Sequence, residues 1–268
     1  MAFDRACIQL IRTGTTEMSD RGEPFVSIIV PAYNEAQRLE ASITALCSYL
    51  ASVPWSHEVL LMVEKSTDGT LELARQLAVG RGIEVVGSDV QRGKGHAVRR
   101  GMLRARGEIA FFMDADLSTP LAEVERFIGR FSANPPVDVL VGNRQHAQSE
   151  ILTRQHLLRR KMGQTFNAIL RVIAGIRIAD TQCGFKAFRR AARTAIFPLQ
   201  KIDGFAFDVE VLLLADRLGF AVEDMPVKWS NAAGSKVRII RDSFRMLCDA
   251  IRVRRLVAKT IAGTKAAP

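Results

Sequence analysis

The sequence predicts an α/β fold in which a mainly parallel sheet is covered by helices on both faces. Short apolar runs alternate with stretches whose apolar residues recur at helical spacing. The runs are apolar throughout rather than at every second residue, which is typical of strands buried on both faces. The chain has 268 residues, of which 48% are hydrophobic and 25% charged, so it can bury such a sheet.

The first half of the chain alternates strands with helices. Each strand is a short run rich in β-branched or large apolar residues, and each helix is marked by apolar residues three or four apart, as at Leu39 and Ile43. In chain order, strands are expected at 25–30, 58–63, 83–87, 108–113 and 137–142. The helices between them are expected at 39–50, 70–78, 95–106 and 121–131.

Outside this alternation the pattern is less regular. Residues 1–24 show no clear period and are expected to form a loose tail. The region near Gly142 divides the domain into two halves. In the second half, helices are expected at 154–174, 208–218 and 240–259, and strands at 183–188 and 220–229.

Polar residues directly follow three of the predicted strands. Residues 31–35 follow the first strand, residues 64–69 the second, and Asp114 and Asp116 the fourth. In open α/β sheets, ligands bind beyond the carboxyl ends of the strands. Two carboxylates at such an end can share one Mg²⁺ or Mn²⁺ ion, whose shell substrate phosphates often complete. The pair predicts a metal site, and an ordinary polar loop is the alternative.

Several common catalytic patterns are absent from the sequence. Residues 92–95 lack the spacing of a P-loop, and no G-x-G-x-x-G follows the first strand, which argues against a dinucleotide enzyme. If residues 92–95 start a helix, they can offer backbone N–H groups and a cation to a phosphate. The alternative is that they form a plain glycine turn. The four histidines show no ligand spacing and are expected at the surface.

The net charge of +10 is concentrated in two segments. Residues 236–268 carry nine Lys or Arg and two Asp, and residues 144–171 carry six Lys or Arg and one Glu. Such segments attract phosphates, acidic lipids or nucleic acid, and a solvated basic surface is the alternative.

The sequence predicts a cytoplasmic protein. The apolar runs are far shorter than the roughly twenty residues of a membrane span, and the first residues do not form a signal peptide. The four cysteines form no metal or disulfide pattern, which favours a reducing compartment.

Four motifs occur in a characteristic order: SIIVPAYNEAQRLE, STDGT, RGKGHAVRRGMLRARGEIAFFMDADLSTP and GNR. Together they resemble the large inverting family of nucleotide-sugar glycosyltransferases with the GT-A fold. The later motifs DTQCGFKAF, GFAFDVEVLLLA, PVKW and GSKVRIIRDSFRMLCDAIRVR resemble the branch that contains the dolichyl/polyprenyl-phosphate glucosyl- and mannosyltransferases. The resemblance spans about residues 25–255.

The resemblance implies transfer of a hexose, glucose or mannose, from a nucleotide sugar to a polyprenyl phosphate. The transfer would be a single displacement with inversion, assisted by Mg²⁺ or Mn²⁺. A glycosyltransferase domain would cover residues 25–235, with a nucleotide-sugar half at 25–142 and an acceptor half at 143–235. Residues 236–268 would form a basic segment facing the acceptor and the membrane.

Carried over motif by motif, the resemblance gives the donor-side residues their roles. Pro31, Tyr33 and Glu35 would surround the nucleotide base. Asp114 would hold the ribose side, and Asp116 would bind the metal on the diphosphate.

Further residues are assigned to phosphates and to the sugar. These are Lys94 and Arg144 at a phosphate, Gln182 and Gly184 beside the sugar, and Lys236 and Arg238 at the acceptor phosphate.

Two positions carry open alternatives. The family usually has two aspartates and a glycine before STDGT, where this chain has Val63, Glu64 and Lys65. Glu64 would replace the second aspartate. Asp208 stands where relatives with hydroxyl acceptors place a general base; here it either positions the substrate or caps the helix that starts there.

The C-terminal segment separates the competing functions. A helix over 240–259 would place Phe244, Leu247, Ile251 and Ala258 on one apolar side and arginines on the rest, so it would lie peripherally in the headgroup plane at the cytoplasmic face of a membrane. The alternative is that this helix packs on the domain.

A transferase with a small soluble phosphorylated acceptor would not need this basic helix. A degenerate transferase domain that binds nucleic acid or an anionic surface is opposed by the aspartate pair and the nearly neutral first half.

Overall fold

The structure is a computed structural model that describes residues 22–153, 175–176, 178–230 and 252–263. Residues 1–21 of the expected tail and the expected helix at 154–174 lie outside the described residues. The same is true of residues 231–251, which include Lys236 and Arg238.

The first half alternates strands and helices as expected. Its elements are β1 (Val26–Ala32), α2 (Ala36–Leu50), β2 (His57–Val63), α3 (Thr70–Ala78), β3 (Ile83–Gly87), α4 (Lys94–Arg104), β4 (Ile109–Met113), α5 (Glu123–Phe131) and β5 (Val139–Asn143). The second half adds β6 (Ile151–Thr153), β7 (Phe185–Arg189), α7 (Arg190–Ile196), α8 (Phe207–Arg217), β8 (Val222–Pro226) and β9 (Trp229–Ser230).

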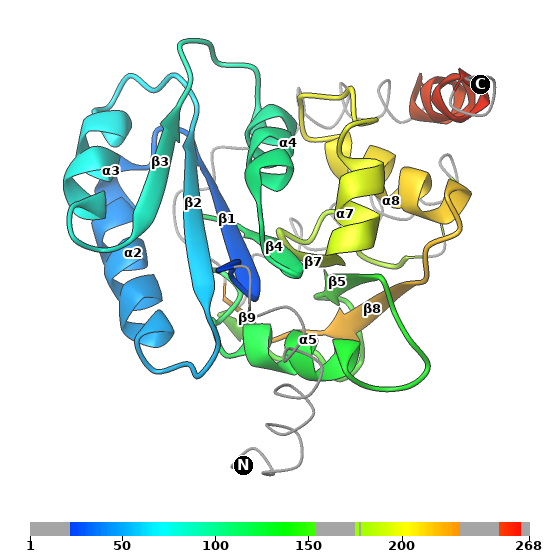
Figure 1. Ribbon diagram of the computed structural model, residues 1–268, viewed down its shortest axis with the longest axis horizontal. Helices are drawn as coiled ribbons and strands as arrows, with labels where there is room; N and C mark the ends of the chain where they lie inside the picture. The colour runs from blue at the N-terminus through cyan, green and yellow to red at the C-terminus, as the bar shows by residue number, and fades with distance from the viewer. Residues whose placement is uncertain (1–21, 154–174, 177, 231–251, 264–268) are drawn as a thin grey trace.

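Seven strands form one sheet in the order β3-β2-β1-β4-β7-β5-β8 (Figure 1). Strand β1 is parallel to both β2 and β4. The chain builds outward from β1 through β2 and β3 and then returns to the other side of β1 with β4. This reversal of strand order puts a topological switch point at the carboxyl ends of β1 and β4, and ligands bind at such points in folds of this type.

Strand β7 is the exception to the parallel arrangement. It runs antiparallel to both of its neighbours, β4 and β5. Phe185, the first residue of β7, is therefore paired with Met113, the last residue of β4. The segment just before β7 consequently lies beside the Asp114 loop, although about seventy residues separate the two in the sequence.

Two clusters of buried residues pack on opposite faces of the sheet. Helices α2, α3 and α5 contribute to one cluster, for example through Leu39, Leu77 and Phe127. Helices α4, α7 and α8 contribute to the other, for example through Val98 and Leu213. The prediction of a mainly parallel sheet covered on both faces is therefore confirmed.

The second half departs from the prediction in its details. The expected strand at 220–229 is divided into β8 and β9, because β8 ends at Pro226, which has no N–H to continue a ladder. Strand β9 pairs with β6 in a separate two-stranded sheet. The short elements β6 and α7 were not predicted.

The described part of the C-terminal segment packs on the domain. Residues 252–263 are helical, and Val253 and Val257 are buried in the cluster of α4, α7 and α8. Ala258, which was expected on the apolar side of a membrane-facing helix, is exposed. The described residues thus match the alternative of packing on the domain, and membrane contact by this segment stays a prediction.

Candidate active site

The loop after β2 holds the loop after β1 in place. Ser66 Oγ accepts a hydrogen bond from the backbone N–H of Asn34 at 3.0 Å, and Asn34 Oδ1 accepts one from the backbone N–H of Thr67 at 2.8 Å. Thr70 Oγ1 accepts a third, from the N–H of Glu35, at 2.8 Å. Hydrogen bonds with the STDGT motif thus fix the backbone conformation of the PAYNE motif.

Asp68 completes this link between the two loops. Its carboxylate accepts hydrogen bonds from the N–H groups of Ala36 and Thr70, both at 3.1 Å. Burial raises the pKa of Asp68, but the bonds from Thr70 and Ala36 outweigh it and lower the pKa overall. Asp68 is therefore an ionised anchor.

The residues expected around a nucleotide base lie at the end of β1. Tyr33 is 39% exposed, and the next residue, Asn34, has a φ of 53°. Pro31 is partly buried within the strand, and Glu35 forms an ion pair with Arg38 at 2.8 Å. A left-handed non-glycine residue costs free energy, so the turn that presents the Tyr33 ring is held by its contacts with the STDGT loop.

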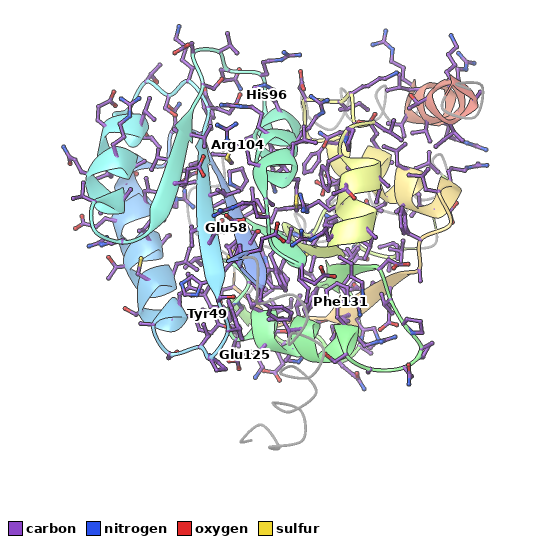
Figure 2. The ribbon with its side chains drawn as sticks, in the orientation of Figure 1. Tyr49, Glu58, His96, Arg104, Glu125 and Phe131 are labelled. Carbon is purple, nitrogen blue, oxygen red and sulfur yellow. The ribbon has the colours of Figure 1, made fainter. Side chains whose placement is uncertain are left out.

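Glu64 is buried beside the start of α4. Its side chain is 2% exposed and accepts hydrogen bonds from the N–H groups of Arg92 and Gly93 and from His96 Nδ1, at 2.7, 3.2 and 2.8 Å. His96, on the first turn of α4 (Figure 2), is mostly buried and not a surface residue as expected. Glu64 anchors the start of α4 because the N–H groups there need an acceptor.

This anchoring changes the prediction for residues 92–95. The N–H groups of Arg92 and Gly93 are engaged by Glu64, and the N–H of His96 is engaged by the carbonyl of Asp203 at 3.1 Å. These three donors are not directed at a phosphate. The contribution of this helix start to the site is the ammonium of Lys94.

Lys94 and Asp114 form an ion pair at the carboxyl end of β4. Lys94 Nζ lies 2.5 Å from Asp114 Oδ1. Burial lowers the pKa of Lys94, but the charges of Asp114 and Asp208 more than compensate and raise it. The site therefore contains a cation that stays protonated.

Gly184 is required by the position of the Asp114 carboxylate. A Cβ atom at Gly184 would lie 1.9 Å from Asp114 Oδ2, far inside contact distance. The N–H of Asp114 donates to the carbonyl of Gly184 at 3.1 Å. Near Gly184, Gln182 has a buried Nε2 atom without a hydrogen-bond partner among the described residues. The structure thus brings together Asp114 and the segment expected beside the sugar.

Asp116 makes contacts different from those of Asp114. Its Oδ1 accepts a hydrogen bond from the N–H of Ser118 at 2.9 Å, and its Oδ2 lies 3.8 Å from Arg38 Nη1. The next residue, Leu117, has a φ of 49°. Within the described residues no group of three or more His, Cys, Asp or Glu side chains could hold a metal. A metal at Asp116 would need substrate oxygens as further ligands.

Arg144 is held by a buried carboxylate. Asp180 Oδ2 accepts hydrogen bonds from the backbone N–H and Nε of Arg144, at 3.0 and 2.7 Å, and Oδ1 accepts one from Nη2 at 2.9 Å. The guanidinium carbon lies 5.6 Å from the centre of the Trp229 ring. The Arg144 charge is thereby fixed in orientation.

A second ion pair lies buried behind the site. Lys186 is fully buried and donates hydrogen bonds to Asp208 Oδ1 and to the carbonyl of Cys183, at 2.5 and 2.7 Å. Burial raises the pKa of Asp208, and the charges of Lys186 and Lys94 oppose that rise. Asp208 makes no capping hydrogen bond to α8, so the capping alternative was wrong.

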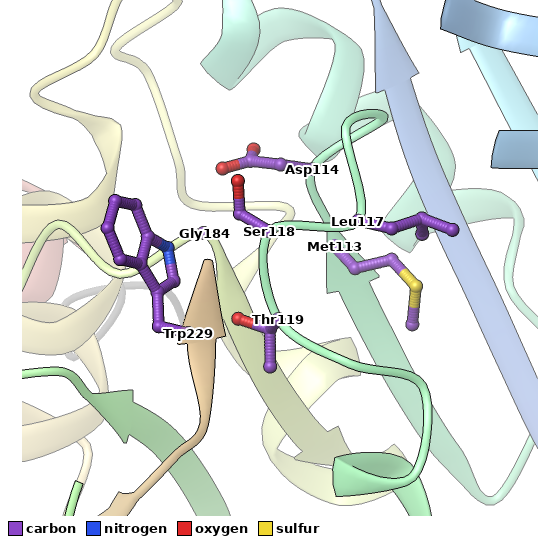
Figure 3. Close-up of a pocket in the computed structure, with 7 residues that line it drawn as sticks. All are labelled: Met113, Asp114, Leu117, Ser118, Thr119, Gly184 and Trp229. Carbon is purple, nitrogen blue, oxygen red and sulfur yellow. The ribbon is translucent and has the colours of Figure 1, made fainter. Parts of the chain in front are cut away.

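A small pocket opens beside Asp114 (Figure 3). It is lined by Met113, Asp114, Leu117, Ser118, Thr119, Gly184 and Trp229. The sequence reasoning did not identify Ser118, Thr119, Trp229 or Lys186. A lysine inside the otherwise apolar strand CGFKAF was the one available signal, because charged residues are seldom fully buried without a partner.

Comparison with protein families matches residues 27–197 to the family described as glycosyl transferase family 2. The dolichyl-phosphate beta-glucosyltransferase of Saccharomyces cerevisiae is 33% identical over 89% of this chain and 76% of its own length. The human protein of the same name is 30% identical over 79% of this chain and 69% of its own length.

Solved structures show the same fold at lower identity. Glucosyl-3-phosphoglycerate synthase from Mycobacterium tuberculosis, bound to UDP, has a TM-score of 0.61 at 21% identity, covering 90% of this chain and 82% of its own. Mannosyl-3-phosphoglycerate synthase from Rubrobacter xylanophilus has a TM-score of 0.62 at 20% identity, covering 97% and 79%. The fold is the GT-A fold.

Proposed function

Because this chain belongs to glycosyl transferase family 2, we propose that it transfers glucose from UDP-glucose to a polyprenyl (dolichyl-type) phosphate with inversion. The chain is a glycosyltransferase. Glucose and a lipid phosphate are favoured because the relatives at 30–33% identity carry the name dolichyl-phosphate beta-glucosyltransferase. UDP-glucose is bound in a structure of the mycobacterial synthase, which supports it as the donor.

The observation that favours a phosphate acceptor is that three carboxylates at or behind the site are each paired with a cation. Asp114 contacts Lys94, Asp180 contacts Arg144, and Asp208 contacts Lys186. Asp180 and Asp208 are in addition almost completely buried. A carboxylate held by a cation, or shielded from the acceptor, is a poor general base.

A phosphate acceptor needs no such base. The second pKa of a phosphate monoester is about 6, so its oxygen is already an anion near neutral pH. This oxygen attacks the anomeric carbon as the bond to the diphosphate breaks, and one displacement inverts the configuration. A hydroxyl acceptor would have to lose a proton to a group at the site, which makes it the weaker candidate.

Lys94 and Arg144 would stabilise the departing diphosphate. Lys94 remains protonated, and the Asp180 carboxylate fixes the orientation of the Arg144 guanidinium. Fixed charges of this kind stabilise negative charge that develops in a transition state. A donor phosphate that approaches Lys94 would compete with Asp114 for its ammonium.

The residues at the site also fit one divalent cation. Asp116 offers hard carboxylate oxygens and is 27% exposed, so it would be the protein ligand of Mg²⁺ or Mn²⁺. The ion would neutralise charge on the diphosphate. The mycobacterial synthase was crystallised with Mn²⁺, UDP-glucose and phosphoglyceric acid.

We place the reaction at the cytoplasmic face of a membrane, where a polyprenyl phosphate exposes its headgroup. No helix among the described residues has the length and hydropathy of a membrane span. Arg252, Arg255 and Lys259 lie on the exposed side of the helix at 252–263 and would face anionic headgroups.

A donor and acceptor panel tests the function. UDP-glucose and GDP-mannose are each incubated with a short polyprenyl phosphate or with 3-phosphoglycerate, and products are identified by mass. We expect polyprenyl-phosphate glucose, whose β-linkage NMR would establish. Exclusive formation of a glycosylated phosphoglycerate would replace the lipid acceptor with a soluble one.

A further inference from the structure

Trp229 is the one aromatic side chain among the described residues that line the pocket beside Asp114. Its backbone N–H donates to the carbonyl of Glu150 at 2.8 Å, and the N–H of Ser230 donates to the carbonyl of Ser118 at 2.7 Å. The β9 backbone is therefore tied both to the segment before β6 and to the pocket itself.

The indole is also supported by a fixed cation. Arg144, held by Asp180 through Nε and Nη2, lies 5.6 Å from the centre of the Trp229 ring. Contact between a guanidinium and an aromatic face is favourable, especially where both groups are partly buried. The ring thus has a defined orientation before any ligand binds, which lowers the entropy cost of using it as a binding surface.

Besides Met113 and Leu117, the pocket is lined by three polar side chains, those of Asp114, Ser118 and Thr119. The side chains of Ser118 and Thr119 are largely buried, and the Asp114 carboxylate lies beside them. Figure 3 shows the Asp114 carboxylate and the Thr119 hydroxyl directed toward the side of the pocket where the indole lies. An apolar wall thus faces hydrogen-bonding groups across a small space.

This combination matches the chemistry of a pyranose. The C–H groups on a face of the sugar ring are apolar and pack on an aromatic ring, while its hydroxyls hydrogen-bond to carboxylates and hydroxyls. We propose that Trp229 forms one wall of the subsite for the transferred hexose and discriminates between hexoses by packing on the ring face. The proposal rests on the proposed function, since it takes the transferred group to be a nucleotide-linked hexose.

The chain makes a direct spectroscopic test possible because it contains two tryptophans. Trp55 is 8% exposed and packs in the core against Tyr49 and His57. A Trp55→Phe variant keeps an aromatic ring there and leaves Trp229 as the single tryptophan. Its emission is recorded during titration with UDP-glucose, UDP, GDP-mannose and GDP, and binding is measured in parallel by calorimetry.

We expect the emission to change with a nucleotide sugar and to change much less with the matching diphosphate. A change of equal size with both would show that the indole responds to the nucleotide alone and would overturn the proposal. The same conclusion would follow if emission stayed constant while calorimetry detected binding, or if no sugar bound differently from its diphosphate.

Two variants separate sugar contact from structural support. Trp229→Leu should weaken binding of the nucleotide sugar about tenfold and leave diphosphate affinity within about twofold, a difference of roughly 1.4 kcal/mol. Trp229→Phe, which keeps a ring, should recover most of the loss. Equal weakening of both ligands would assign Trp229 a structural role and refute the sugar contact.

The fluorescence and binding results do not depend on which acceptor the protein uses. Transfer to polyprenyl phosphate is measured with the unaltered protein. A sugar-specific change in emission without lipid product would refute the proposed acceptor and support the hexose wall. Lipid product without a sugar-specific change would support the proposed function and refute the hexose wall.

Discussion

Asp114 and Asp116 follow the same strand, but their contacts give them different roles. Asp114 is paired with Lys94 and confined by Gly184, whereas Asp116 accepts a hydrogen bond from the Ser118 N–H and lies near Arg38. The spacing of two carboxylates at a strand end predicted that they share a cation, whereas the structure gives them different cationic neighbours. In the proposed reaction, Asp116 alone is the metal ligand.

Replacing Asp116 with asparagine tests this division. Asp116→Asn keeps the size of the side chain and its acceptor for the Ser118 N–H, but it removes the charge that a hard cation requires. We expect at least a hundredfold loss of turnover, on the scale of losing one strong electrostatic contact in the transition state, with unchanged thermal unfolding. Turnover of the unaltered protein should cease in excess chelator and return with Mn²⁺. Full turnover in chelator would refute metal dependence.

Gly184 allows an equally specific test at the level of one atom. In Gly184→Ala the new Cβ would lie 1.9 Å from Asp114 Oδ2, so the carboxylate must leave its place beside Lys94. We expect kcat/KM to fall tenfold or more, about 1.4 kcal/mol of transition-state stabilisation.

Gly129→Ala is the matched control. Gly129 lies in α5 with open space around it, and alanine there should stabilise the helix by about 1 kcal/mol and leave kcat/KM unchanged. If Gly184→Ala retains full activity, the Asp114 position is not critical.

Between elements, the Lys186–Asp208 pair joins β7 to α8 directly beneath the site. Lys186 also bonds to the carbonyl of Cys183, next to Gly184. Lys186→Met leaves Asp208 buried without its closest cation and should destabilise the fold by about 3–5 kcal/mol. The double variant Lys186→Met/Asp208→Asn removes both charges and should recover much of that stability. Urea unfolding measures both effects, and equal stability of the two variants would contradict the coupling.

The pair also predicts a pH dependence. Burial raises the pKa of Asp208, and Lys186→Met removes an opposing charge, so the pKa rises further in the folded variant. The pKa of an aspartate in an unfolded chain is about 3.9. When folding raises the pKa of a group, the free energy of unfolding decreases as pH rises from the unfolded pKa toward the folded pKa. The free energy of unfolding of Lys186→Met should therefore decrease from pH 5 to pH 8, and the double variant should lack this slope.

Sequence periodicity predicted most elements because each buries a continuous apolar face, as α2 does through Leu39 and Ile43. It could not predict that β7 runs antiparallel, since an apolar strand carries no sign of its direction. That direction is what places Gly184 beside Asp114. Trp229 reaches the site through contacts that no local pattern encodes, whereas the strand-end motifs with Asp114 were found because parallel strands end at one edge of the sheet.

For the whole molecule, the C-terminal helix links the core to the proposed membrane surface. Val253 and Val257 are buried, so this helix cannot insert its apolar side into a bilayer without exposing the core. Its exposed cations remain available to anionic headgroups through charge alone. Deleting the helix would damage the fold, and a test of membrane binding must therefore change the charges and keep the apolar side.

The charge-removing variant Arg252→Ala/Arg255→Ala/Lys259→Ala meets this requirement, since all three side chains are exposed. Each cation near an anionic leaflet contributes about 1 kcal/mol, so the three together should change partitioning by about a hundredfold. The unaltered protein should float with phosphatidylserine-containing vesicles at low salt and dissociate at high salt, because these contacts are screened. The control Arg75→Ala/Arg81→Ala/Arg104→Ala removes the same charge from exposed positions elsewhere and should still float. Equal flotation of both variants would show that the membrane contact lies outside this helix.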